Sequence, residues 1–92
     1  MDLVDRLLDA VKSMEPLIRE HAAEAERERR LSTVVANAMR DAGLYKMFRA
    51  KARGGFEADP VTGFRVLEEV SRIDSAAGWN LQLSNGVDMF GP

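Results

Sequence analysis

The sequence predicts an all-α protein, a small bundle of about four helices within a single helical domain of residues 1–92. Apolar residues recur every three to four positions in several segments, which is the period of a helix with one buried face. Two of these segments begin with residues typical of a helix start, at Ser32 and at Asp59-Pro60. None of the segments shows a convincing strand pattern, so we predict helices throughout.

The first helix is predicted from about Asp2 to Arg30. We expect one long helix with a bend at Pro16, because a proline inside a helix removes a hydrogen bond and kinks the axis. Its apolar positions follow the helical period and include Leu3, Leu7, Leu8, Val11, Met14, Leu17 and Ile18.

The second helix is predicted to begin after Ser32, whose hydroxyl suits an N-cap. Its apolar positions are Val34, Val35, Ala38, Met39 and Ala42. Gly43 fits the left-handed position that commonly follows a helix. The apolar cluster that comes next, Leu44, Tyr45, Met47 and Phe48, is compatible with an extended turn or with one helical turn.

The third helix is predicted to begin at Asp59-Pro60, as an N-cap followed by proline at the first helical position. Gly63 lowers helix propensity, which predicts a close packing partner at that position. The predicted buried face consists of Val61, Phe64, Leu67, Val70 and Ile73.

The fourth helix is predicted to begin after a second cap at Asp74-Ser75, with a small-residue face at Ala76, Ala77 and Gly78. Asn85-Gly86 signals its end or a turn. Near the C-terminus, the apolar side of the helix is predicted to form an exposed patch, which usually marks an interface. That patch would comprise Leu81, Leu83, Met89 and Phe90.

Composition limits the possible functions. The net charge of −2 gives no broad attraction to nucleic acid or to an anionic membrane, and the absence of cysteine excludes disulfides and thiolate chemistry. No apolar run approaches the ~20 residues of a membrane span. The N-terminus lacks the basic start and apolar centre of a signal peptide. We therefore expect a cytoplasmic location, without nucleic-acid or membrane partners.

Most polar clusters in the sequence indicate solvent-exposed surface and not a metal-binding, phosphate-binding or catalytic site. His21 is the only histidine, and we expect a solvent-exposed structural role because no second histidine or cysteine completes a metal site. The four positive charges at Lys46, Arg49, Lys51 and Arg53 are candidates for a phosphate contact, but a solvated loop is the simpler interpretation. Gly54-Gly55 lacks the following lysine and hydroxyl of a phosphate-binding loop, which favours a turn.

The order of motifs from the glycine pair onward resembles the N-terminal domain of the acyl-CoA dehydrogenase superfamily. The matching pieces are Gly54-Gly55, the run Glu68-Glu69-Val70-Ser71-Arg72-Ile73-Asp74, and the small residues that lead to Trp79. The ending Ala77-Gly78-Trp79-Asn80 is most similar to the branch of flavin-dependent monooxygenases that hydroxylate phenols. The resemblance covers roughly residues 8–83. The sequence departs from the family in the loop just before the glycine pair. In the family this loop usually carries apolar residues and a proline, whereas here it carries Arg49, Ala50 and Arg53.

The resemblance implies the N-terminal part of a longer, three-domain flavoenzyme that uses FAD or FMN. It implies that Trp79, Asn80, Leu83 and Ser84 form a wall of the substrate and flavin cavity. The other reading is that Trp79 is a core residue. No catalytic residue and no metal ligand are expected in this chain, which by itself would be inactive and would not bind flavin tightly. Dehydrogenation and hydroxylation both remain open.

The expected partners are the missing middle and C-terminal domains, or further copies of the chain in a homo-oligomer. The alternative is a free-standing helical interaction module that dimerises through the same apolar patch without flavin. A small DNA-binding domain has the least support, because no helix carries a concentrated basic face.

Overall fold

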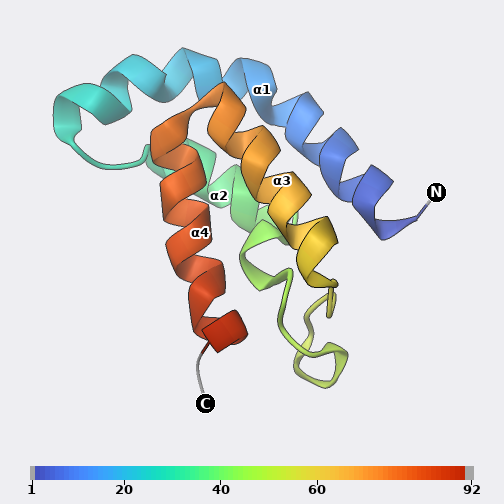
Figure 1. The fold of residues 1–92 in the computed structure, drawn as a ribbon. Helices are drawn as coiled ribbons and strands as arrows, with labels where there is room; N and C mark the ends of the chain where they lie inside the picture. The colour runs from blue at the N-terminus through green and yellow to red at the C-terminus, as the bar shows by residue number, and fades with distance from the viewer. Residues whose placement is uncertain (1, 91–92) are drawn as a thin grey trace.

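The computed structural model describes residues 2–90, with side chains described to residue 86. In this part of the chain it contains four α-helices and two short 3₁₀ turns, in agreement with the predicted all-α fold. The elements are α1 (Leu3–Glu28), α2 (Thr33–Asp41), η1 (Leu44–Lys46), η2 (Lys51–Arg53), α3 (Pro60–Ile73) and α4 (Ser75–Phe90). Helix α3 packs against both α1 and α4 (Figure 1).

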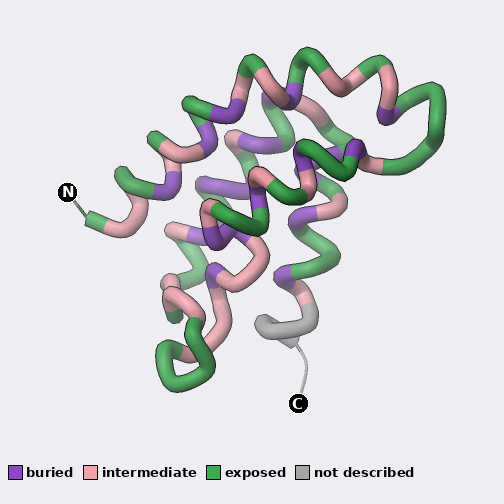
Figure 2. Tube along the Cα trace, turned by 180° about the vertical axis from the view of Figure 1, so that it is seen from behind, coloured by how far each residue is buried: buried purple, intermediate pink, exposed green. Residues whose placement is uncertain are grey.

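The predicted long first helix is confirmed. Helix α1 runs without interruption through Pro16, and Figure 1 shows its axis changing direction along its length. The buried positions face the other helices, as Figure 2 shows. They are the apolar residues Leu7, Val11, Met14, Ile18 and Ala25.

Local signals placed most helix ends correctly. Asp59 Oδ1 accepts a hydrogen bond from the Thr62 backbone N–H at 2.7 Å, so the predicted N-cap of α3 is confirmed. This hydrogen bond also lowers the pKa of the Asp59 carboxyl below its ordinary value. Gly43 follows α2 with φ 82°, as expected. Ser32 occupies the N-cap position of α2, but its hydroxyl makes no capping hydrogen bond.

The predicted buried face of α3 is partly wrong. Leu67, Val70 and Ile73 are buried, but Val61 and Phe64 are 69% and 50% exposed. The buried stripe instead begins at Gly63, because the Phe48 ring packs where a Cβ of residue 63 would be. That contact confirms the predicted close partner of Gly63 and turns Phe64 outward, where its ring makes an edge-to-face contact with Phe48.

The predicted end of the last helix at Asn85-Gly86 is also wrong. Helix α4 continues to Phe90, and Asn85 is 1% exposed in its interior. Its side chain hydrogen-bonds the backbone around η1 and also the Leu81 carbonyl one turn earlier in α4, so it is satisfied without ending the helix. Of the predicted C-terminal patch, Leu83 is exposed and Leu81 is fully buried. The side chains of Met89 and Phe90 lie outside the described residues.

An ion-pair network joins α1 to α3. The Glu15 carboxylate lies 2.9 Å from Arg19 Nε and 3.3 Å from Arg72 Nη2, and Arg72 also pairs with Glu69 at 2.6 Å. The two arginines, Arg19 foremost, lower the pKa of the Glu15 carboxyl below its ordinary value of 4.5. Because the folded state favours the ionised form, the stability from this group is present above pH 4.5 and is lost as the pH falls through the folded pKa.

Replacing Glu15 by glutamine is therefore expected to lower stability slightly at pH 7 and to flatten the loss of stability below pH 4.5, since exposed ion pairs contribute little each. Urea unfolding at pH 7 and at acidic pH measures both effects. The matched control is Glu68→Gln, on the exposed face of α3. An unchanged acid dependence in Glu15→Gln would show that the network does not hold the two helices together.

Candidate functional site

The candidate site is built on the first turns of α4. The Asp74 carboxylate accepts a hydrogen bond from the Ala77 backbone N–H at 3.3 Å, which confirms the predicted second cap and fixes where the helix begins. Ala77, Gly78 and Leu81 turn inward, and Gly78 lies against Ser71 of α3. The small residues thus let the two helices approach closely, and the opposite side of α4 is left facing outward.

Trp79 lies on that outward side. The residue is 61% exposed, so the reading of Trp79 as a core residue is wrong. Leu83, one turn further along, is 57% exposed. Two large apolar side chains therefore form an uncovered stripe on α4.

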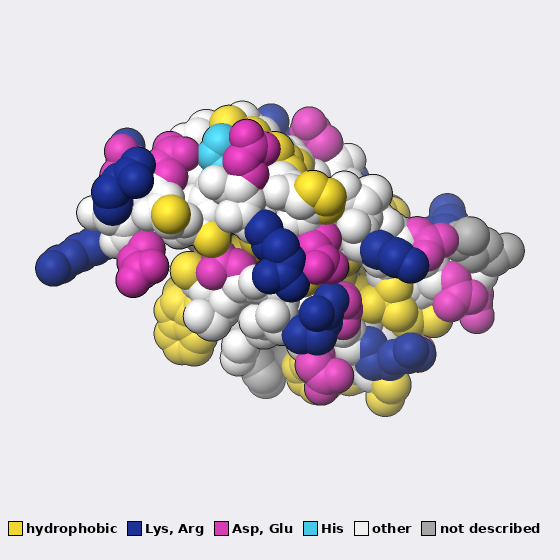
Figure 3. Space-filling model, turned by 90° about the horizontal axis from the view of Figure 1, so that it is seen from above, with side chains coloured by type: hydrophobic (Ala, Val, Ile, Leu, Met, Phe, Trp, Pro, Cys, Tyr) yellow, Lys and Arg dark blue, Asp and Glu magenta, His cyan; other side chains and the backbone are white. Residues whose placement is uncertain are grey.

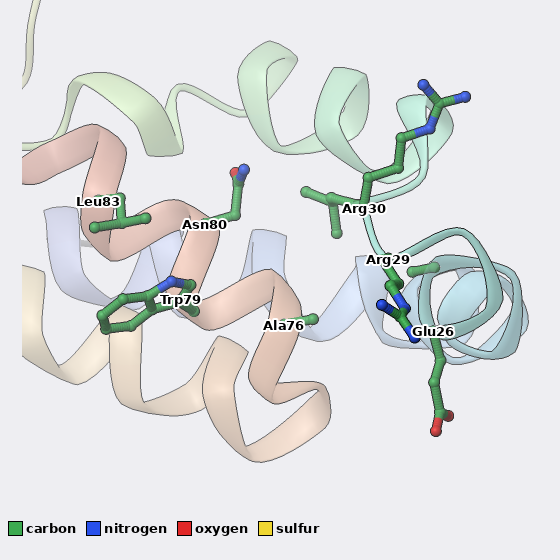
Figure 4. A pocket seen from close by; sticks show the side chains of 9 residues that line it. Glu26, Arg29, Arg30, Ala76, Trp79, Asn80 and Leu83 are labelled. Atoms are coloured by element: carbon green, nitrogen blue, oxygen red, sulfur yellow. The ribbon is translucent and has the colours of Figure 1, made fainter.

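The stripe borders a pocket of about 340 Å³ between the end of α1 and the start of α4. Figure 4 shows Trp79, Asn80 and Leu83 along one side of it and Arg29 on the other. The lining residues come from the last turn of α1 with the loop after it, and from α4: Ala25, Glu26, Arg29, Arg30, Leu31, Ala76, Trp79, Asn80 and Leu83. Three of the four predicted site residues thus meet at one pocket, while Ser84 is exposed and does not line it.

Asn80 is held by a residue that sequence reasoning did not assign to the site. The Tyr45 hydroxyl donates a hydrogen bond to Asn80 Oδ1 at 2.7 Å. Burial raises the pKa of the Tyr45 phenol above its ordinary value, which keeps the hydroxyl protonated as a donor at neutral pH. No local pattern predicts this contact, because the two residues are 35 positions apart.

The predicted end of α1 near Arg30 is close to the observed end at Glu28, but the place of Arg29 at the pocket was not predicted. Arg29 has a left-handed backbone, with φ 56°, and its N–H donates to the carbonyls of Ala25 and Glu26. Arg30 N–H donates to the Ala25 carbonyl at 3.1 Å. This turn directs the chain from α1 past the start of α4. The only signal in the sequence was the expected end of a helix shortly before Ser32.

The other candidate clusters lie away from this pocket. His21 is half-buried, not solvent-exposed as expected, and its Nδ1 lies 2.9 Å from Glu24 Oε2. Lys46 Nζ lies 5.9 Å from the centre of the Phe56 ring, and Gly54 forms a turn with φ 83°. Among the described residues, no group of three histidine, aspartate or glutamate side chains is placed to hold a metal ion.

Two further surface properties concern possible partners. Acidic and basic side chains are interspersed over the face seen in Figure 3. In the part of the chain that the structure describes, no helix combines the length and apolar character needed to cross a bilayer.

Comparison with known proteins identifies relatives of the chain. Residues 6–91 match the family described as "Acyl-CoA dehydrogenase, N-terminal domain". The chain is 32% identical over 75 residues to an indole-3-acetate monooxygenase of Pseudomonas putida, which covers 82% of this chain and 18% of that protein.

Two further relatives are named flavin-dependent monooxygenase, oxygenase subunit HsaA. The one from Rhodococcus jostii is 28% identical over 64 residues, or 70% of this chain and 17% of the relative. The one from Mycobacterium tuberculosis H37Rv is 27% identical over 73 residues, or 79% of this chain and 18% of the relative. No solved structure matches the chain significantly.

The chain thus spans less than a fifth of the length of the curated relatives that it matches. The matched residues include α1 from Arg6 onward, the other three helices and the loop with the glycine pair. The chain therefore belongs to the family of acyl-CoA dehydrogenase N-terminal domains.

Proposed function

We propose that the chain is the N-terminal helical domain of a longer, three-domain flavin-dependent monooxygenase. In this proposal Trp79, Asn80 and Leu83 form one wall of the substrate cavity, with Ser84 one turn beyond Asn80 on the same helix. The observation that supports it is the 61% exposure of Trp79 beside a pocket. A large aromatic surface left uncovered in this way usually contacts a ligand or another domain.

The relatives favour a monooxygenase activity for the whole enzyme, since three of them carry that name. Oxidation would then take place with FAD or FMN supplied mainly by the remaining domains. The glycine pair does not by itself fit a flavin phosphate. Gly54 lies in a turn, and the next helix begins only at Pro60, so neither glycine of the pair opens a helix N-terminus. We accordingly derive no chemical step from these residues.

Further exposed apolar residues support packing on other domains. Val61 and Phe64 are exposed on α3, and the Phe64 ring centre lies 6.2 Å from that of Phe48. We assign this second surface to contacts with the middle or C-terminal domain, or with another copy of the enzyme. A cytoplasmic location remains part of the proposal.

A chimera tests the cavity wall. The corresponding N-terminal segment of the Pseudomonas putida indole-3-acetate monooxygenase is replaced by this chain, and the KM for indole-3-acetate is measured with and without Trp79→Ala. We expect the substitution to raise KM about 10-fold, because one lost apolar contact in a substrate pocket is worth roughly 1–3 kcal/mol.

Val34→Ala is the matched control, since Val34 is 47% exposed on α2 and does not line the pocket. Unchanged KM and kcat in the Trp79→Ala chimera would contradict the proposal that Trp79 forms part of the substrate-cavity wall. The alternative of a free-standing interaction module predicts no active chimera. It also predicts a stop after the codon for Pro92, where the proposal expects a frame that continues into a β-rich domain and a second helical bundle.

A further inference from the structure

Asn85-Gly86 is a chemically labile pair of residues at a buried position. The chain has three asparagines, Asn37, Asn80 and Asn85, and only Asn85 is followed by glycine. Asparagine deamidates most readily before glycine, because a residue without a Cβ lets its backbone nitrogen reach the preceding side-chain amide. The sequence by itself therefore marks Asn85 as the asparagine of this chain that is most open to deamidation.

Deamidation needs a backbone arrangement that a helix does not provide. In this reaction the Gly86 nitrogen attacks Asn85 Cγ, the bond from Cγ to Nδ2 breaks, and the proton of the attacking nitrogen leaves with the amide as ammonia. Water then opens the cyclic succinimide to aspartate or isoaspartate. Inside a helix, each backbone N–H donates to the carbonyl four residues earlier, so the attacking nitrogen is not free. Helix α4 continues through both residues to Phe90.

The side chain of Asn85 is held in place as well. Asn85 is buried, and its Nδ2 donates to the Leu44 carbonyl at 2.9 Å and to the Leu81 carbonyl at 3.0 Å. Its Oδ1 accepts from the Met47 N–H at 3.2 Å. The nitrogen that would leave is thus bound twice, and Cγ is shielded from water. The fold therefore suppresses a reaction that the local sequence favours.

Deamidation would also remove the contacts that suppress it. At neutral pH, the carboxylate of an aspartate at residue 85 has no hydrogen to donate, so it would face the carbonyl oxygens of Leu44 and Leu81 unpaired. Burying an unpaired charge is among the most destabilising changes a protein can undergo. Isoaspartate would in addition insert a methylene group into the backbone of α4. An opening of α4 that is reversible in the unmodified chain would therefore become irreversible after the reaction.

We propose that Asn85 is a site of spontaneous deamidation that is latent in the folded chain and reacts when α4 separates from η1. The modification marks molecules that have opened and prevents them from restoring the contact between the two elements. Because α4 packs on η1 through these hydrogen bonds, the rate of deamidation reports the fraction of molecules in which they have separated. The proposal is independent of flavin chemistry and of the cavity wall assigned above.

Peptide mass spectrometry of the 92-residue chain tests the site. In concentrated urea at mildly alkaline pH, we expect Asn85 to deamidate faster than Asn37 and Asn80. In native buffer at the same pH its rate should fall at least about 10-fold, because only the opened fraction reacts. A peptide of residues 83–88, measured in both solutions, corrects for the effect of urea itself. In urea, Gly86→Ala should slow the reaction to about the rate of Asn37, which is followed by alanine.

The consequence of the modification is tested with its product. Asn85→Asp should unfold at a urea midpoint at least about 1 M below that of the parent, because the buried donors are lost and a charge takes their place. The deamidated parent, which its added negative charge separates on an ion-exchange column, should share the lowered midpoint. Asn37→Asp adds the same charge on the exposed face of α2 and is the matched control, with a nearly unchanged midpoint.

Three results would each overturn the proposal. Deamidation of Asn85 in native buffer at the rate of the peptide would show that the fold does not shield it. A rate in urea no higher than that of Asn37 would show that the pair is not labile. An Asn85→Asp chain as stable as the parent would show that the product is tolerated. If Asn85→Asp does not fold, that result agrees with the proposal, and the two rates measured on the parent still test it.

Discussion

Replacing Asn85 by alanine is expected to lower the free energy of unfolding by about 3 kcal/mol, because it leaves buried backbone groups without partners. Asn85 Nδ2 donates to the Leu44 carbonyl at 2.9 Å and to the Leu81 carbonyl at 3.0 Å. Asn85 Oδ1 accepts from the Met47 N–H at 3.2 Å. The side chain thus joins α4 to both ends of the η1 turn, and alanine can replace none of these contacts.

Urea unfolding of the variant and the parent measures this difference. Hydrogen exchange at the Met47 amide gives a local readout, since that N–H should lose its protection first. Asn37→Ala, on the exposed face of α2, is the control and should change stability by less than about 0.5 kcal/mol. An Asn85→Ala protein as stable as the parent would mean that water or other groups satisfy the η1 backbone.

Replacing Gly78 by alanine is expected to lower the free energy of unfolding by about 2 kcal/mol, because α3 and α4 would have to separate. A Cβ at residue 78 would overlap Ser71 Oγ and lie 2.7 Å from Ser71 Cα. The Ser71 backbone cannot move aside as a flexible side chain would. The higher helix propensity of alanine offsets only about 1 kcal/mol of this cost.

Gly86→Ala is the matched control, because it lies in the same helix and a Cβ there would meet no atom of the described residues within 4 Å. We expect it to raise stability by about 1 kcal/mol, which is the difference in helix propensity. The two glycine-to-alanine changes should therefore have opposite signs in the same unfolding assay. Stabilisation by both would show that the close approach of α3 and α4 at Gly78 is not needed for packing.

Much of the fold could be predicted because its signals are local. The Asp59 cap, the proline that follows it, the left-handed Gly43 and the helical period of α1 each depend on neighbours within a few residues. The same holds for the Asp74 cap, which fixes where α4 begins. Part of the candidate site could also be predicted from local signals, because Trp79, Asn80 and Leu83 lie on one helix.

The rest depends on contacts between distant segments. The helical period of α3 is compatible with either Phe64 or Val66 facing the core. Because the Phe48 ring packs against Gly63, Val66 is buried and Phe64 is exposed. Asn85-Gly86 is a turn signal by itself, but the unsatisfied backbone at Leu44 and Met47 made Asn85 a buried residue of a continuing helix.

By itself, the sequence determined that this protein forms helices, where most of them begin, and to which family the pattern belongs, because periodicity and capping act over one or two turns. Only the tertiary structure decided which side of α4 is buried. Small residues at Ala77 and Gly78 bring that side against α3, which leaves the indole of Trp79 outside. Long-range packing likewise brought Tyr45 and Arg29 to the pocket, since no local rule relates residues that far apart.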